Sequence, residues 1–198
     1  MAHALELACG HRPLTFPGSS RTADPIRANA DLAATVRAVV SGDQAAFARL
    51  YADYVRMVHA IILSRVPHRD VDDLVQEVFI TAYTRIKELR NAAAFGGWLA
   101  TIARNRATDY RRRAREPVEL PAELPGGDAI ESETLAVLDI VRKLPDAYRE
   151  TLLMRLVEGM TGDEIAARTG LTPGSVRVNL HRGMKMLREQ LGMEPAQP

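Results

Sequence analysis

Cysteine is nearly absent from this sequence, and that absence excludes two kinds of structure. Cys9 is the only one among 198 residues, so the chain can form neither an intramolecular disulfide nor a zinc site built from several cysteines. Long apolar runs are also missing, since no stretch approaches the roughly 20 residues of a membrane-spanning helix. The N-terminus lacks the basic start and the apolar segment of an export signal. We therefore expect a cytoplasmic protein without membrane insertion.

An excess of one charge is missing as well. The 26 basic and 25 acidic residues leave a formal net charge of +1, so the charge of the whole chain says little about its partners. What the sequence does contain is local segregation of charge, which the average hides. With 198 residues, the chain is long enough for one domain or for two small ones.

The clearest segregation of charge lies between Asp70 and Arg115. Apolar residues recur at three- and four-residue steps over 71–89, the spacing of one buried helix face. The residues left outside this face are Asp72, Asp73, Gln76, Glu77 and Thr81. A second helix, predicted over 98–115, carries six arginines against one acid, Asp109. Such a pair of helices suits a protein partner on one surface and a polyanion on the next.

The remaining segments predict further helices and two irregular stretches. Residues 1–28 contain prolines and glycines without helical period and are expected to form a disordered tail. Asp31 and Asp43 are suited to cap the next two helices. Residues 116–133 combine acids, prolines and glycines with no lysine or arginine, which predicts a flexible acidic linker. We expect an all-α fold of two small helical domains joined by this linker.

The second of these domains contains the pattern of a helix-turn-helix. Thr161 and Glu164 have the spacing of a capping box, which predicts a short helix that ends at Gly170. A second helix is predicted over 173–191, with Thr172 as its N-cap. In this helix Val176, Leu180, Met184 and Leu187 are predicted to face inward, and Ser175, Arg177, Val178, His181, Arg182, Lys185 and Arg188 to face outward. That arrangement is typical of a recognition helix that lies in the major groove of DNA.

These blocks together resemble the extracytoplasmic-function sigma factors, the small two-domain initiation subunits of bacterial RNA polymerase. The resemblance is carried by DLVQEVFITAY, by FGGWLATIARNRATDYRRR and by residues 144–191, in the order and separation of the family. It implies an alternative sigma factor with a region 2-like domain at 29–115 and a region 4-like helix-turn-helix domain at 134–192. The linker then corresponds to the connector that threads the polymerase channel, where its negative charge can mimic RNA. Residues 193–198 form a second tail.

The resemblance also implies partners. The family's helix that matches 70–89 docks on the coiled coil of the largest polymerase subunit, and the polymerase flap is a further contact. The residues implied in coiled-coil binding are Asp73, Gln76 and Glu77. The family also implies an anti-sigma factor that masks these surfaces. No cofactor is expected.

Promoter contacts are implied on both domains. Those with the minus-ten element are Arg90 and Asn91, in the loop that captures an unstacked base, and Arg104, Asn105, Arg111 and Arg112 on the following helix. Those with the minus-thirty-five element are Ser175, Arg177, Val178, His181 and Arg182. Many family members have a basic-Ser-Arg run where this chain has Arg177-Val178-Asn179, so the promoter sequence cannot be transferred. Trp98 shares a helix face with Phe95 and is expected in the core rather than stacked on bases.

Two other functions remain open at this point. One is a sigma-like decoy that occupies an anti-sigma factor without touching DNA, and the other is a free-standing helix-turn-helix regulator, which would dimerise to read paired half-sites. An enzyme is the least favoured class. His68, Asp72, Asp73 and Glu77 suggest a metal cluster only weakly, because the sequence offers no second cluster, no glycine-rich phosphate loop and no nucleophile with a matching base.

Overall fold

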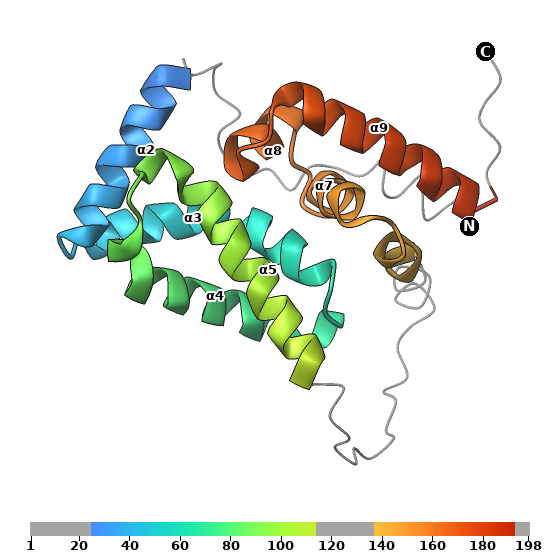
Figure 1. Ribbon diagram of the computed structural model, residues 1–198, viewed down its shortest axis with the longest axis horizontal. Helices are drawn as coiled ribbons and strands as arrows, with labels where there is room; N and C mark the ends of the chain where they lie inside the picture. The colour runs from blue at the N-terminus through green and yellow to red at the C-terminus, as the bar shows by residue number, and fades with distance from the viewer. Residues whose placement is uncertain (1–24, 114–136, 193–198) are drawn as a thin grey trace.

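The computed structural model describes residues 25–113 and 137–192, and within these ranges the chain forms helices and no β-strand (Figure 1). The predicted all-α fold is thereby confirmed. We call the two ranges the N-terminal module and the C-terminal module. The predicted linker at 116–133 and the tail at 193–198 lie outside the described residues.

Each module is a small group of helices. The N-terminal module consists of α2 (Pro25–Val40), α3 (Gln44–Leu63), η1 (His68–Asp70), α4 (Val71–Arg85), η2 (Ile86–Glu88), η3 (Ala92–Ala94) and α5 (Phe95–Arg113), where η marks a short 3-10 helix. The C-terminal module consists of a helical segment at 137–142 followed by α7 (Asp146–Leu156), α8 (Gly162–Thr169) and α9 (Pro173–Gln190).

The first two helices begin at different kinds of residue. The Asp43 carboxylate accepts a hydrogen bond from the amide nitrogen of Ala46 at 3.0 Å, which confirms Asp43 as the N-cap of α3. By contrast, α2 begins at Pro25, so the start predicted at Asp31 is wrong, and residues 25–28 belong to this helix. A proline at the first helical position has no amide hydrogen to leave unsatisfied, which favours the earlier start.

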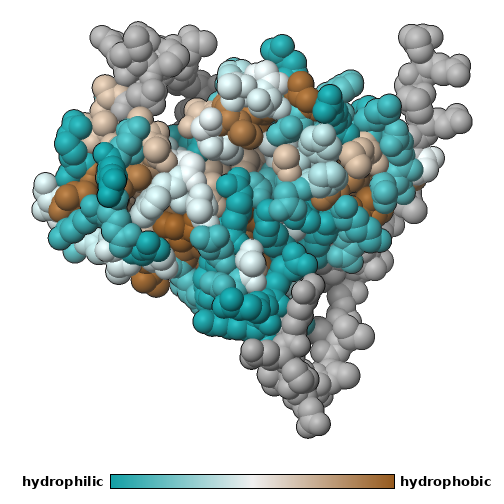
Figure 2. All heavy atoms as spheres, viewed as in Figure 1, coloured by the Kyte–Doolittle hydropathy of each residue, from teal (hydrophilic) through white to brown (hydrophobic). Residues whose placement is uncertain are grey.

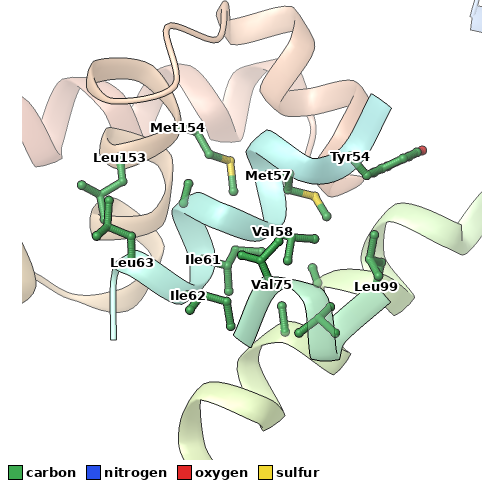
Figure 3. Close-up of a cluster of buried hydrophobic side chains, with 14 of the residues drawn as sticks. Tyr54, Met57, Val58, Ile61, Ile62, Leu63, Val75, Leu99, Leu153 and Met154 are labelled. Carbon is green, nitrogen blue, oxygen red and sulfur yellow. The ribbon is translucent and has the colours of Figure 1, made fainter. Parts of the chain in front are cut away.

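The N-terminal module is built around α3. The side chains of Met57, Val58 and Ile61 are completely buried, and α3 packs against α2, α4 and α5. Figure 3 shows Val75 of α4 and Leu99 of α5 directed toward this helix. Each large apolar side chain buried in this way stabilises the fold by about 1.5–3 kcal/mol relative to an exposed one.

The helix that opens the charged stretch, α4, is shorter than predicted. It ends at Arg85, and Ile86–Glu88 forms a 3-10 turn, so the prediction of a regular helix up to Leu89 is wrong in its last turn. Asp70 precedes α4, yet its carboxylate does not cap the helix. Instead it accepts a hydrogen bond from the hydroxyl of Tyr110 at 2.7 Å, which ties the start of α4 to α5.

The helix-turn-helix forms as predicted. The backbone amide of Thr161 donates to the Glu164 carboxylate at 2.7 Å, and the amide of Glu164 donates to the Thr161 hydroxyl at 3.2 Å. Gly170 ends α8 in the left-handed conformation, with φ 76°. The Thr172 hydroxyl then accepts from the amide of Ser175 at 3.1 Å and starts α9.

The two modules share one continuous core. α7 packs along α3, while α8 contacts both α3 and α5. Figure 3 shows Leu153 of α7 beside Leu63 of α3, and Met154 next to the same helix; all three are at most 1% exposed. At Gly96, near the start of α5, the backbones approach so closely that a Cβ atom would collide with the carbonyl oxygen of Arg168 in α8.

Candidate nucleic-acid interface

The outer face of α5 carries most of the side chains predicted to meet a polyanion. Asn105, Arg111 and Arg112 are exposed, and the side chain of Arg112 is 76% exposed even though it pairs with Asp109 at 3.2 Å. Figure 2 shows hydrophilic residues over the lower front of the molecule, where Figure 1 places the end of α5. This end of the helix is therefore open to a large anion.

Arg104 is the exception on this helix, because a carboxylate of the C-terminal module holds it. Its Nε and Nη2 donate to Glu150 at 3.1 and 2.8 Å, and these hydrogen bonds raise the pKa of Arg104. Glu150 also pairs with Arg65 at 2.6 Å. Arg104 thus lies at the boundary between the modules and is engaged by Glu150, whereas Arg111 and Arg112 of the same helix are open to solvent.

The loop before α5 is ordered by its own cap. The side-chain oxygen of Asn91 accepts a hydrogen bond from the amide of Ala93 at 3.0 Å, and Asn91 and Arg90 are both exposed. Phe95 is completely buried and fixes the start of the helix. The ring centroid of Trp98 lies 5.9 Å from that of Phe95, and Trp98 packs against the core, as the sequence predicts.

The outward face of α4 presents the predicted acid and amide. Asp73 and Gln76 are exposed, whereas Glu77 is partly covered and forms an ion pair with Arg106 of α5. The Glu77 side chain is still 46% exposed. Glu77 therefore has a structural contact that the sequence did not reveal, and it links the acidic helix to the cationic one.

The recognition helix α9 presents its predicted face to solvent. Arg177, Val178, His181 and Arg182 are all exposed, with Val178 at 45%. Ser175 is exposed as well, but its hydroxyl is hydrogen-bonded to that of Thr172 at 2.9 Å and belongs to the cap. The helix therefore holds two arginines and one histidine ready for contact.

A groove between α7 and α9 was not predicted. Its volume is about 510 Å³. Its apolar lining comes from Leu152, Leu156, Leu180 and Met184, and charged or polar side chains that line it are Arg155, His181, Lys185, Arg188 and Glu189. Leu180 and Met184 face inward as predicted and pack against the core, but they are only half-buried because they also line this groove. The sequence does contain a signal for this groove: the apolar faces of the two helices are wider than the area that they can bury against each other.

Sequence reasoning also missed the polar contacts between the modules. Besides the contacts of Glu150, Arg168 donates to Asp53 at 3.1 Å, and His59 pairs with Glu158 at 2.5 Å. The hydrogen bond with Glu158 raises the pKa of His59. The partners in these contacts lie between 46 and 115 residues apart, and no local pattern indicates such pairs.

The described residues contain neither a cluster suited to a metal ion nor a helix suited to a membrane. Within 25–113 and 137–192, no three histidine, cysteine, aspartate or glutamate side chains come close enough to hold a metal ion, and His68, Asp72, Asp73 and Glu77 form no such group. In those ranges, too, no helix is both long and apolar enough to cross a membrane.

Two packed helical modules, each with an exposed arginine-bearing helix and one with a helix-turn-helix, are the features of a DNA-binding protein. Residues 50–116 match the family model described as Sigma-70 region 2, and residues 134–187 match that of Sigma-70, region 4. The sigma factor CarQ of Myxococcus xanthus is 32% identical over 160 residues, which cover 76% of this chain and 92% of CarQ. The chain belongs to the extracytoplasmic-function family of sigma factors and is an alternative sigma factor.

Other comparisons agree with this assignment. The sigma-E factor of Escherichia coli K12 is 33% identical over 171 residues, which cover 77% of this chain and 90% of that protein. The solved structure of CnrH in complex with the cytosolic domain of CnrY is similar with a TM-score of 0.56 and 28% identity, and covers 85% of this chain and 99% of that one. The family consists of transcription regulators.

Proposed function

We propose that this sigma factor directs core RNA polymerase to promoters through three separate surfaces, in the cytoplasm and without catalysis of its own. The observation that carries this proposal is the placement of the charged side chains. An acidic and amide-bearing face on α4 lies next to a cationic face on α5, and α9 presents a second cationic face. A protein that must hold a protein partner and a polyanion at the same time needs this separation.

The α4 surface is proposed to bind the coiled coil of the largest polymerase subunit. Asp73 and Gln76 supply its freely exposed carboxylate and amide. Arg106 of α5 already pairs with one carboxylate oxygen of Glu77. Glu77 therefore contributes its other, exposed oxygen to this surface. An arginine-rich partner would be recognised by such a face.

The loop and α5 are proposed to bind the minus-ten element. Arg90 and Asn91 border the site for an extruded base, while Asn105, Arg111 and Arg112 lie along the helix for contact with phosphates. The side-chain oxygen of Asn91 accepts from the backbone amide of Ala93, which leaves its side-chain nitrogen as the group for base recognition. Extrusion of a base costs a few kcal/mol, which these contacts must offset. Arg104 would join them only after it leaves Glu150.

The C-terminal module is proposed to read the minus-thirty-five element. Arg177 and Arg182 are the candidates for bidentate contacts with base edges or phosphates, and Val178 can pack on a thymine methyl group. His181 lies beside them. Ser175 would contribute through its backbone, because its hydroxyl is engaged with Thr172.

The groove between α7 and α9 is proposed as the site for the polymerase flap. Its apolar floor and basic rim suit an amphipathic helix with acidic flanks, which binds by burying its apolar face. This contact would hold the C-terminal module on the polymerase while Arg177, Val178 and Arg182, which do not line the groove, meet DNA.

We infer the following division of the chain for this function: a tail at 1–24, a region 2-like domain that begins with α2 and covers 25–115, the connector at 116–133, a region 4-like domain at 134–192 and a tail at 193–198. An anti-sigma factor is proposed as the regulator. The supporting observation is the similarity to CnrH, whose structure contains the cytosolic domain of CnrY.

The proposal is tested by a pull-down of core RNA polymerase with the full chain and with the double variant Asp73→Ala, Gln76→Ala. The wild-type protein should bind, and the variant should lose at least most of that binding. A matched control, Asp31→Ala with Gln44→Ala, removes the same two chemical groups from exposed positions on α2 and α3 and should bind normally. Equal binding by all three proteins would move the polymerase site away from α4. No binding by any of them would favour a decoy or a free-standing regulator.

A further inference from the structure

Glu150 of α7 is a buried acid that serves two cations of the other module. The whole residue is only 5% exposed. One carboxylate oxygen pairs with Nη1 of Arg65 at 2.6 Å, and the other accepts from Nη2 of Arg104 at 2.8 Å. Two arginines from different elements of the N-terminal module thus converge on one carboxylate.

The N-terminal module itself positions one of the two arginines. The side chain of Arg65 is only 7% exposed, and its Nη1 donates to the hydroxyl of the neighbouring Ser64 at 2.7 Å. Its Nη2 donates to Asp146 of α7 at 2.5 Å, so this contact, like that with Glu150, belongs to the closed molecule. Arg104 is 42% exposed, so one side of the pair reaches solvent. A guanidinium recognises carboxylate and phosphate oxygens with the same hydrogen-bond geometry.

Charges of both signs surround this site. Burial lowers the pKa of Arg149, the carboxylates of Asp146 and Glu150 raise it, and the nearby charges of Arg65 and Arg111 lower it further. Arg104 and Arg111 are seven positions apart on α5, which is about two helical turns, so both lie along one face of this helix. The proposed path of the minus-ten strand along α5 therefore leads toward the site around Glu150.

We propose that Arg65 and Arg104 form an anion site that Glu150 occupies in the closed molecule and that a DNA backbone phosphate occupies once the modules separate. Glu150 acts as an intramolecular clasp, and Arg65 becomes an additional phosphate contact. The proposal rests on the proposed function, because it takes α5 as the helix that lies along the minus-ten strand. It goes further by stating that the closed molecule withholds part of that binding site.

Gly96 provides a second, uncharged way to open the molecule. A Cβ atom at this position would collide with the carbonyl oxygen of Arg168, so Gly96→Ala must push α8 away from α5. At Gly97 the nearest atom across the interface, the carbonyl oxygen of Thr169, would lie 3.9 Å from a new Cβ. Gly97→Ala is therefore a matched control with the same change of residue on the same helix turn.

The first measurement is the distance between the modules by fluorescence energy transfer in the full chain. Donor and acceptor are attached after Lys87→Cys and Gln190→Cys, both at exposed positions, with Cys9→Ser to remove the native thiol. We expect transfer to fall in Glu150→Gln and in Gly96→Ala, and to stay at the wild-type value in Gly97→Ala. Unchanged transfer in Glu150→Gln overturns the clasp, whether or not Gly96→Ala opens the molecule.

The second measurement is binding of a short fluorescein-labelled oligothymidine as a function of salt. The opened variants should bind roughly three-fold or more tightly at low salt, with a log–log slope steeper by about 0.7 for each phosphate gained. Adding Arg104→Ala to Glu150→Gln should keep the modules apart and return the slope toward the wild-type value. Opening without any change in slope overturns the anion site.

These readouts separate the clasp from the function on which it rests. If the wild-type chain fails to bind polymerase but energy transfer still responds to Glu150→Gln, the proposed function fails and the clasp stands. If polymerase binding is normal and transfer does not respond, the clasp fails alone.

Discussion

Several side chains of this protein are engaged inside the molecule although their position suits them to a partner. Glu77 pairs with Arg106, and Arg104 pairs with Glu150. A buried or half-buried ion pair of this kind adds little net stability, because desolvation offsets most of the attraction. Its effect is to fix geometry, and it can be exchanged for an intermolecular pair at modest cost.

His59 gives one such pair a pH dependence. The hydrogen bond with Glu158 raises the pKa of His59 above 6.5, so the stabilisation is fully present below pH 6.5 and is lost as the pH rises through the folded-state pKa. The wild-type free energy of unfolding should therefore decrease relative to that of His59→Gln as the pH rises above 6.5. Urea titrations of both proteins at several pH values measure this difference. If the difference in free energy of unfolding between the two proteins stays constant with pH, the His59–Glu158 pair is not its source.

Arg177 and Arg182 are expected to carry recognition by α9. If the contact with a base is bidentate, replacing either arginine with alanine should weaken binding to the cognate minus-thirty-five duplex by about 1–3 kcal/mol. The reason is that the base then loses both of its hydrogen-bond donors. Binding is measured by fluorescence anisotropy once a promoter has been mapped. Arg49→Ala removes an exposed arginine on α3, away from the proposed DNA surfaces, and should change the affinity little.

At the scale of the helices, the caps decide where the helix-turn-helix begins and ends. Thr161→Ala removes the hydroxyl that accepts the amide of Glu164, and should lower the free energy of unfolding by about 1 kcal/mol. Thr161→Ser keeps a hydroxyl at the same position and should retain most of the stability. Urea unfolding followed by circular dichroism distinguishes the two variants. Equal losses would mean that the methyl group, and not the cap, is responsible.

The same scale shows what could be predicted from the sequence. Caps and turns depend on residues three or four positions apart, so Asp43, Thr161, Gly170 and Thr172 could be assigned their places directly. The end of α4 is harder to predict, because the apolar spacing continues through the 3-10 turn. This turn buries Ile86 as a regular helical turn would.

Contacts between distant segments could not be predicted in this way. Glu150 has the same local pattern as a solvated helical acid, and only the packing of α7 on α3 makes it a buried one. Likewise Leu180 and Met184 follow the period of a core stripe, yet no further helix of the described residues covers them. The role of a side chain at such positions is decided by which surfaces meet, and that information is spread over the whole chain.

For the whole molecule, the shared core predicts cooperative unfolding. Since Leu153 and Met154 are buried against α3, the two modules should unfold with urea in a single transition, with the same midpoint by circular dichroism and by the energy-transfer pair. Gly96→Ala should separate this into two transitions, because each module would then unfold by its own stability. Two transitions already in the wild-type protein would show that the interface contributes little to stability.

The central position of α3 has a consequence for how such proteins can be recombined. One side of this helix is complementary to α4 and α5, and another side is complementary to α7. A chimera that takes its promoter-reading half from a relative would therefore bring a foreign α7 against a native α3. We expect such hybrids to function only when the contact residues of both helices are inherited from the same parent.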